Sequence, residues 1–378
     1  MPKNIVILCD GTSNEISEDR TNVLRLYGTL KKDGEQLVYY DPGVGTFGAA
    51  NSVSYYYRRL LEIWGLATGW GLDQNVKEAY RFLVEYYDNG KRDNGEHEEP
   101  DQIYIFGFSR GAYTARVLAG FIHSVGLFDS HNLNLLDYAY RAYKAIGANA
   151  KNGKDQTKKN PFAEVRLFER MLRAKRPAIR CLGLFDTVGS VIEMGRFGPR
   201  LLSHAFTRSN TSVEAIRHAV ALDERRTMFH PQLWPEGGEY WGGPFQPKTQ
   251  VPQDVNEVWF AGVHGDVGGG YPEQKSQLAK IPLLWMIDET KKLGLRFKTQ
   301  TINEIVLGKN PDKHYVSPDP KAPKNKSMNL VWAILEFLPR KRRETTTRHF
   351  SIFGFYLPLF ERRKVPDNAN THPTVSQR

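Results

Sequence analysis

Cysteine is nearly absent from this sequence, with only Cys9 and Cys181 among 378 residues. Each lies inside a short apolar stretch of β-forming residues, so we interpret both as buried free thiols rather than as a disulfide or a metal site. With no other cysteine to pair, a disulfide framework is excluded. We expect neither a metal nor a cofactor.

Long hydrophobic runs are also missing. No stretch approaches the roughly 18 uninterrupted apolar residues that a membrane-spanning helix needs. The first residues, MPKNIVILCDGTSN, hold an apolar stretch that is too short for a signal peptide and runs straight into a polar turn. We therefore expect synthesis in the cytoplasm without signal peptide or transmembrane helix, and any export by a signal-independent route.

Acidic residues are outnumbered, with 42 Asp and Glu against 52 Lys and Arg, a net charge of +10. Much of the excess lies in Arg340–Lys364, where eight basic residues face two acids. This segment also contains the apolar run SIFGFYLPLF, which suggests peripheral contact with an anionic membrane. Alternatively, its apolar side completes the core while its charges stay solvated. Pro358 interrupts any helix there and favours the second interpretation. Nucleic-acid binding ranks third, because no reading motif is present.

Short β-forming runs alternate with amphipathic helical stretches, which predicts an α/β fold with a mostly parallel sheet covered on both faces. The strands are expected at Asn4–Cys9, Gln36–Tyr40, Gln102–Phe108, Ala178–Phe185 and Glu257–Val263, and helices at 72–87, 111–126 and 277–294. We expect one catalytic domain over 1–340 and a basic, apolar extension over 341–378 that ends in a disordered tail. Three segments read as insertions that form a lid or substrate wall: 45–72, 129–176 and 226–256.

A glycine-flanked serine follows the third predicted strand, in the stretch IYIFGFSRGAY. Gly107-Phe108-Ser109-Arg110-Gly111 matches G-x-S-x-G between a strand and a helix, the context of a strained turn that exposes a nucleophile. Residues two places from the serine must lack a β-carbon in such a turn. The backbone N–H of Arg110, at the helix N-terminus, would face a developing oxyanion.

A nucleophilic serine needs a histidine base and an orienting acid, each placed after a later strand. Asp186 ends the apolar run in RCLGLFDTVGS, and His264 ends that in EVWFAGVHGDVGGGY. Weaker alternatives are Asp223 and Asp266 for the acid and, for the base, His123 and His218 at helix-like spacing and His230 beside a proline.

The second oxyanion donor is expected from the turn after the first strand, at Gly11 and Thr12. A plain β-turn is an equal alternative for this Asp10-Gly11-Thr12 stretch. Asp-Gly-Thr also follows a strand in phosphatases with an aspartyl nucleophile. Those enzymes need a second Asp where this sequence has Leu8, so the phosphatase interpretation is weak.

Taken together, the blocks CDGTSN, YYDPGVGT, YIFGFSRGAYTAR, LGLFDTVGS, RHAVALDERR and WFAGVHGDVGGGY resemble an uncharacterised α/β-hydrolase family. That family includes the catalytic domain of phospholipase effectors of bacterial type VI secretion. The blocks cover about residues 4–290, and LVWAILEFLPR at 330–340 is also similar. The resemblance implies an α/β-hydrolase fold and a triad that hydrolyses ester bonds, carried here by Ser109, Asp186 and His264. Unlike the secreted effectors, this sequence is expected to be compact, without a large extra module.

The sequence therefore predicts a serine esterase or lipase of phospholipase type, acting on a lipid or small ester through an acyl-enzyme. Two alternatives stay open. One is a hydrolase-fold protein that binds at a membrane surface without turnover. The other is an amidase or acyltransferase that uses the same three residues. The oligomeric state is left open.

Overall fold

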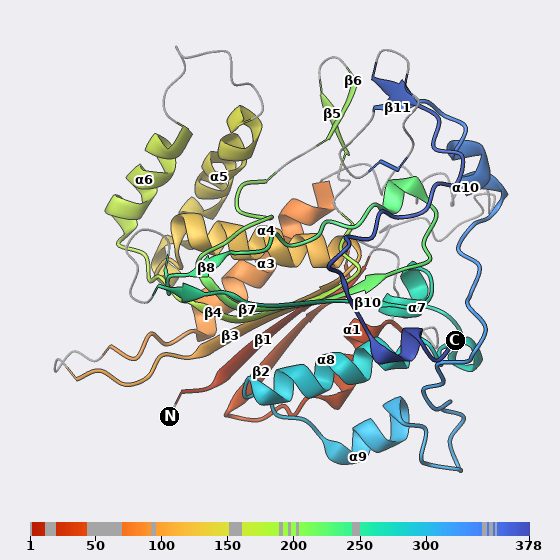
Figure 1. The fold of residues 1–378 in the computed structure, drawn as a ribbon. Coiled ribbons are helices and arrows are strands. Elements are labelled where there is room, and N and C mark those ends of the chain that lie inside the picture. Colours follow the sequence, from red (N-terminus) through yellow and green to blue (C-terminus); the bar gives the residue numbers. More distant parts are fainter. Residues whose placement is uncertain are drawn as a thin grey trace, which may run out of the picture.

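A seven-stranded parallel sheet forms the centre of the computed structural model (Figure 1). Its strands lie in the order β13-β10-β7-β4-β3-β1-β2, and every neighbouring pair is parallel. They are β1 (Asn4–Cys9), β2 (Gln36–Asp41), β3 (Gln102–Phe108), β4 (Ile179–Phe185), β7 (Val213–Ala221), β10 (Asp254–Phe260) and β13 (Asn370–Thr371). The structure describes residues 2–11, 20–43, 70–91, 96–150, 161–188, 192–195, 198–201, 204–243, 250–341, 346–347, 351 and 354–378.

Helices cover both faces of the sheet (Figure 1). One face carries α3 (Trp70–Tyr86) and α4 (Arg110–Val125), and the other carries α1 (Asn22–Thr29) and α8 (Lys280–Lys292). Successive side chains of β1 point alternately to the two faces of the sheet: Ile5 and Ile7 belong to one buried cluster, and Val6 and Leu8 to the other. The sheet is therefore buried on both sides, which confirms the predicted α/β, α/β-hydrolase-like class.

The remaining helices flank this central arrangement. They are α5 (Leu136–Ala150), α6 (Pro161–Leu172), α7 (His264–Gly268), α9 (Thr299–Thr301) and α10 (Leu330–Leu335). Two-stranded sheets are formed by β5 (Ile192–Gly195) with β6 (Gly198–Leu201), β8 (Glu239–Tyr240) with β9 (Val251–Pro252), and β11 (Arg340–Lys341) with β12 (Phe355–Tyr356). None of the helices in the described ranges combines the length and apolar composition that crossing a bilayer requires.

The register brings the carboxyl ends of the five central strands β1, β3, β4, β7 and β10 to one edge. Gly107 at the end of β3 pairs with Cys9 of β1, and Phe108 pairs with Phe185 of β4. Ala221, the last residue of β7, pairs with Phe260 of β10. Residues that directly follow these strands therefore emerge side by side, which is where ligands bind in open parallel sheets.

Two expectations from the sequence are wrong. His218 stands in a central strand, β7, and not in a helix. Because β7 is buried on both faces, its apolar residues do not alternate, and periodicity could not identify it. Residues 365–378 are an ordered edge of the fold rather than a disordered tail. The N–H of His372 donates to the Trp259 carbonyl at 2.9 Å, and β13 pairs with β10.

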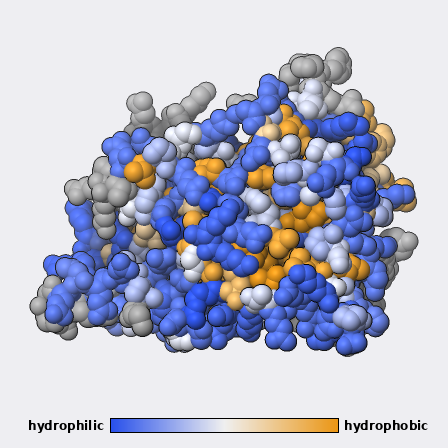
Figure 2. Space-filling view, turned by 60° about the horizontal axis from the view of Figure 1, so that its bottom comes forward, coloured by the Kyte–Doolittle hydropathy of each residue, from blue (hydrophilic) through white to orange (hydrophobic). Residues whose placement is uncertain are grey.

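The segment around Pro358 departs in two respects from the favoured interpretation, in which its apolar side completes the core and its charges stay solvated. Arg363 is only 6% exposed, whereas Phe355 is 52% exposed. Orange side chains lie at the right-hand edge of Figure 2, where Figure 1 places α10. This part of the chain therefore exposes apolar side chains beside the exposed Arg362 and Lys364, and it buries one cation, Arg363.

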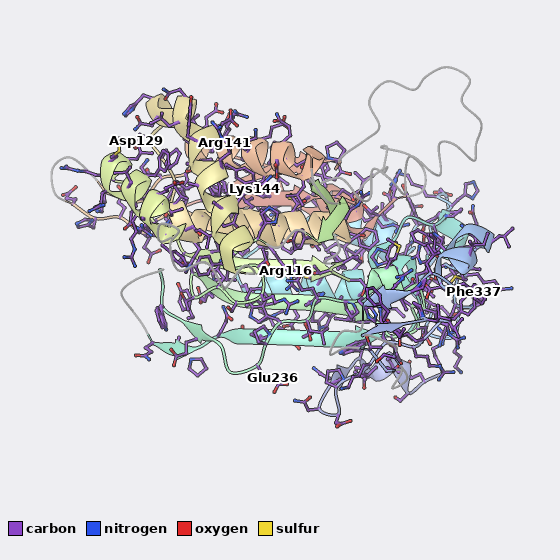
Figure 3. All side chains as sticks on the ribbon, turned by 90° about the horizontal axis from the view of Figure 1, so that it is seen from above. Arg116, Asp129, Arg141, Lys144, Glu236 and Phe337 are labelled. Carbon is purple, nitrogen blue, oxygen red and sulfur yellow. The ribbon has the colours of Figure 1, made fainter. Side chains whose placement is uncertain are left out.

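The predicted insertions lie at different ends of the molecule. Within 129–176, α5 rests on α4 through Tyr140 and Tyr143, whose rings lie 5.2 and 5.5 Å from that of Phe121. Figure 3 places Asp129 toward one end of the molecule and Phe337 at the other. The segment 226–256 reaches the carboxyl edge of the sheet only near its start, and 45–72 lies almost wholly outside the described residues.

Candidate active site

Ser109 occupies a strained turn between β3 and α4. Its backbone has φ 58° and ψ −117°, a conformation that is costly for a residue with a side chain. A Cβ on Gly107 would lie 2.3 Å from the Gly111 carbonyl oxygen, and one on Gly111 would lie 2.1 Å from that of Cys9. Both glycines are thus required sterically, as the G-x-S-x-G pattern predicts for a turn that presents its serine at the sheet edge.

Asp186 and His264 meet at the same edge although 78 residues separate them. Asp186 directly follows β4 and is fully buried, and His264 is the first residue of α7, just beyond β10. The distance from His264 Nδ1 to Asp186 Oδ2 is 2.5 Å. The N–H of Ala221, at the end of the intervening strand β7, donates to Asp186 Oδ1 at 2.9 Å. The sheet itself thereby fixes the carboxylate.

Ser109 is tied to both residues through its neighbours. Its N–H donates to the carbonyl of Phe185, the residue before Asp186, at 3.0 Å. The ring of Phe108, the residue before Ser109, lies 4.7 Å from the His264 ring. The serine, the histidine and the aspartate are therefore neighbours on one rim of the sheet.

Arg363 completes the surroundings of Asp186, and nothing in the sequence analysis indicated it. Its Nη1 donates to Asp186 Oδ1 at 2.6 Å and its Nη2 to Oδ2 at 2.9 Å. The same guanidinium donates to the carbonyls of Ala221 and Phe229. Burial alone would raise the pKa of Asp186, but Arg363 and His264 outweigh it and hold that pKa well below its usual range. The carboxylate is therefore ionised at neutral pH.

The His264 imidazole is enclosed by aromatic rings. Phe229 lies 4.9 Å from it in an edge-to-face arrangement, and Phe108 lies 4.7 Å from it. Burial lowers the pKa of His264, and the hydrogen bond and charge of Asp186 oppose this only in part. A neutral imidazole that donates Nδ1–H to Asp186 carries its lone pair on Nε2, which suits a general base.

The side chain of Glu224 accepts a hydrogen bond from the main chain of His264, and the sequence analysis did not identify this residue either. Its Oε2 accepts the His264 N–H at 3.2 Å, and both of its oxygens accept from Arg226. Burial would raise the pKa of Glu224, but the hydrogen bonds and charge of Arg226 lower it to about 2. The block RHAVALDERR contains both residues, so the resemblance marked the region without indicating its role.

The weaker acid candidates serve other purposes. Asp266 Oδ2 accepts the Val263 N–H at 2.9 Å and so caps α7, and its carboxylate also receives bonds from Asn325. Asp223 accepts from the Gly262 N–H at 2.7 Å and pairs with Lys324. Both shape the loop that carries His264, and neither is the carboxylate bound to its ring.

The alternative histidines have partners elsewhere. His218 Nδ1 lies 2.7 Å from Glu257, and its Nε2 accepts the N–H of Thr187, the residue after Asp186, at 3.2 Å. It is a fully buried support beneath the site. His123 Nδ1 lies 2.8 Å from Ser212 Oγ, and His230 lies 3.5 Å from Glu361.

The predicted oxyanion donors Arg110 and Gly11 lie in different surroundings. Arg110 is the first residue of α4, so its N–H belongs to the helix N-terminus beside Ser109. The N–H of Gly11 donates to Asp10 Oδ1 at 2.6 Å, and Asp10 Oδ2 in turn accepts from Thr21 and Tyr40. Thr12 lies outside the described residues. Within the described ranges no three His, Cys, Asp or Glu side chains are grouped to hold a metal ion.

Known proteins resemble this chain over much of its length. The uncharacterized protein YEL023C of Saccharomyces cerevisiae is 35% identical over 237 residues, which cover 60% of this chain and 32% of the relative. The chain thus spans about a third of that yeast protein.

Two solved structures are also similar. An uncharacterized protein from Pseudomonas aeruginosa covers 79% of this chain, and 46% of its own length, at 21% identity and a TM-score of 0.42. The Tle1 effector bound to the VgrG spike of the type 6 secretion system covers 73% of this chain, and 52% of its own, at 18% identity and a TM-score of 0.35.

A family model described as the catalytic domain of Tle1-like type VI secretion phospholipase effectors matches residues 3–289. This range contains Ser109, Asp186 and His264 and ends before α10 and Arg363. The chain belongs to the Tle1-like family of phospholipase effector catalytic domains.

Proposed function

We propose that this protein is a serine hydrolase that cleaves carboxylic ester bonds of lipids, phospholipids in particular. Ser109 is the nucleophile, His264 the general base and Asp186 the acid that orients it. The observation that carries the proposal is the 2.5 Å contact between His264 and a buried, ionised Asp186 beside a serine on a strained turn. Family membership supports the substrate class, because the matched domain is described as that of a phospholipase effector.

In the first half-reaction the Ser109 hydroxyl oxygen attacks the ester carbonyl carbon while His264 Nε2 takes the hydroxyl proton. Asp186 stabilises the imidazolium that forms, and Arg363 keeps Asp186 ionised meanwhile. The oxyanion faces the N-terminus of α4, where the Arg110 N–H and the helix dipole stabilise negative charge. When the ester C–O bond breaks, the imidazolium returns the proton to the leaving alcohol.

In the second half-reaction water attacks the acyl-enzyme carbonyl and gives a proton to His264. The bond between the acyl group and the Ser109 oxygen then breaks, the serine recovers the proton and a carboxylic acid leaves. Gly11 can serve as the second oxyanion donor only after its N–H has left Asp10. Arg110 is therefore the donor that the proposal needs, and Gly11 is an addition that a ligand would have to induce.

The aromatic surroundings of His264 favour a lipid over a polar ester. Phe108 and Phe229 border the imidazole, and Trp332 of α10 lies 5.3 Å from Phe229 in an edge-to-face contact. Such walls would cover the methylene groups of an acyl chain, each of which gains about 0.8 kcal/mol on burial.

The test is labelling of the folded protein with a fluorophosphonate probe, together with hydrolysis of a short p-nitrophenyl ester and of phospholipid. We expect one labelled site, and Ser109→Ala should remove the label and lower kcat by about 10⁴-fold or more. Ser317→Ala, which alters an exposed serine far along the chain, is the control and should keep label and turnover. A folded wild-type chain that takes no label and cleaves no ester would leave the non-catalytic binding protein as the correct alternative.

A further inference from the structure

An exposed apolar surface lies on α10 and the segment beside it. Large apolar side chains there are 45% to 79% exposed: Leu330, Ile334, Phe337, Leu338, Phe355 and Leu357, together termed the α10 face. The first four are spaced i, i+4, i+7 and i+8, so they share one side of the helix and of the turn that follows it. Contiguous apolar surface of this kind on a folded protein marks an interaction site.

The two parts of the α10 face are joined by contacts. The Phe337 ring lies 5.8 Å from that of Phe360, and the N–H of Leu359 donates to the Glu336 carbonyl at 3.2 Å. The antiparallel pair β11–β12 sets Lys341 opposite Phe355. Figure 3 places Phe337 at the outer edge of the molecule. The face is therefore one surface built from two stretches of chain.

Positive charge is concentrated in the segment that carries this surface, and few acids balance it. Residues 324–364 contain ten Lys and Arg against three Glu. Two of the three, Glu336 and Glu361, are buried at 0% and 6% exposure and accept hydrogen bonds from within the protein. Lys326, Arg362 and Lys364 are exposed. These two acids thus face inward, and the exposed charged residues that the structure describes in this segment are all cationic.

The opposite side of the same segment reaches the candidate active site. Trp332 is buried and contacts Phe229, which contacts the His264 ring. Arg363, between the exposed Arg362 and Lys364, turns inward to Asp186. Whatever binds the α10 face is therefore held next to the residues that would carry the chemistry.

We propose that the α10 face docks the protein on the surface of an anionic lipid bilayer. Its apolar side chains would enter the headgroup boundary while the surrounding cations contact anionic headgroups. This inference deepens the proposed function, on which the meaning of the docking rests, by naming the surface that delivers the substrate. A second copy of the chain fits less well, because a symmetric contact through this face would bring the two sets of cations together.

The apolar contribution is tested by vesicle flotation in the Ser109→Ala background, which prevents hydrolysis of the vesicles. The vesicles contain phosphatidylcholine either alone or mixed with phosphatidylserine. Leu330→Gln/Ile334→Gln should weaken binding to the mixed vesicles by about tenfold or more. Leu167→Gln/Met171→Gln is the matched control: both side chains are apolar, exposed at 50% and 64%, and four residues apart on α6, at the far end of the molecule. It should bind like the parent.

The contribution of charge is tested with a second double variant and its own control. Arg362→Gln/Lys364→Gln should lower binding to the mixed vesicles by about fivefold for each cation and reduce its salt dependence. Lys292→Gln/Lys313→Gln removes two exposed cations elsewhere and should change little. Equal binding to neutral and anionic vesicles would refute the proposal that the bound bilayer is anionic.

Activity assays separate this proposal from the proposed function. With Ser109 intact, Leu330→Gln/Ile334→Gln should keep hydrolysis of a soluble short-chain ester and lose that of vesicle phospholipid. Unchanged flotation of this variant would overturn the docking proposal even if the enzyme is active. So would self-association of the wild type in sedimentation that the variant abolishes, because the face would then be an interface between copies. Normal flotation by a chain that cleaves no ester would refute the proposed function and leave the docking intact.

Discussion

The central sheet and the C-terminal segment 330–364 bury opposite kinds of side chain. In the sheet Ile5 and Ile105 are 0% exposed, as hydropathy predicts. In the segment Ile334 is 60% exposed while Arg363 is 6% exposed. Local partners therefore decide burial here: Arg363 is buried because Asp186 and two carbonyls accept its hydrogen bonds, whereas Ile334 lies on the solvent side of α10.

Removing the buried cation is the most direct way to break this contrast. Arg363→Met should lower the free energy of unfolding by about 3–5 kcal/mol, because it leaves the Asp186 carboxylate buried without its partner. Arg362→Met, one residue earlier but exposed, should change it by less than about 0.5 kcal/mol. Urea unfolding of both variants measures the difference.

A double-mutant cycle identifies the cause of the loss at Arg363. Adding Asp186→Asn to Arg363→Met removes the uncompensated charge, so the pair should be more stable than the sum of the two single changes indicates. Strictly additive losses would mean that Arg363 stabilises the protein through packing alone. The position of Arg363 beside Asp186 would then carry no information about the charge of that carboxylate.

Glycines in the two regions are required for different reasons: one because a side chain would clash, the other only because of its positive φ. Gly111→Ala should cost about 3 kcal/mol, because its Cβ would lie 2.1 Å from the Cys9 carbonyl oxygen in the tightly packed sheet edge. Gly354 has φ +78° with nothing within 4 Å of its Cβ position, so Gly354→Ala should cost only about 1 kcal/mol of backbone strain. Equal losses in thermal or urea unfolding would contradict this distinction.

The dependence of activity on pH probes burial at the sheet edge. Burial lowers the pKa of His264 below 6.5, with Asp186 opposing it in part, and a general base must be neutral. The value of kcat/KM should therefore level off at high pH and fall about tenfold per unit below a midpoint that lies under pH 6.5. A profile on a soluble ester gives the midpoint. A midpoint at neutral pH or above would mean that the ion pair outweighs burial.

The strained turn at Ser109 could be predicted because its pattern is local: Gly107 and Gly111 lie within two residues of Ser109. A Cβ on Gly107 would clash with Gly111 in the same turn, whereas one on Gly111 would meet the Cys9 carbonyl of the neighbouring strand, a contact that only the fold reveals. Asp186 and His264 could be found because each ends a recognisable apolar strand. Their meeting followed from the general rule that parallel strands share a carboxyl edge.

Arg363 and Glu224 could not be predicted, because their roles exist only in three dimensions. In the sequence Arg363 belongs to a basic cluster that is typical of a solvated face, and only the path of the chain past β7 brings it to Asp186. For β7 itself the obstacle was its burial on both faces, which removes the alternation that marks a strand.

The smallest expected change in stability concerns an exposed ring of the segment 330–364. Phe337→Ala should change the free energy of unfolding by less than about 0.5 kcal/mol, since its ring is 57% exposed and meets Phe360 only in an edge contact at 5.8 Å. Phe121→Ala, at a fully buried ring, should cost about 3–5 kcal/mol. If Phe337→Ala cost as much as a core substitution, the α10 face would be holding the segment together. A near-neutral change means that folding leaves this ring free to bind something else.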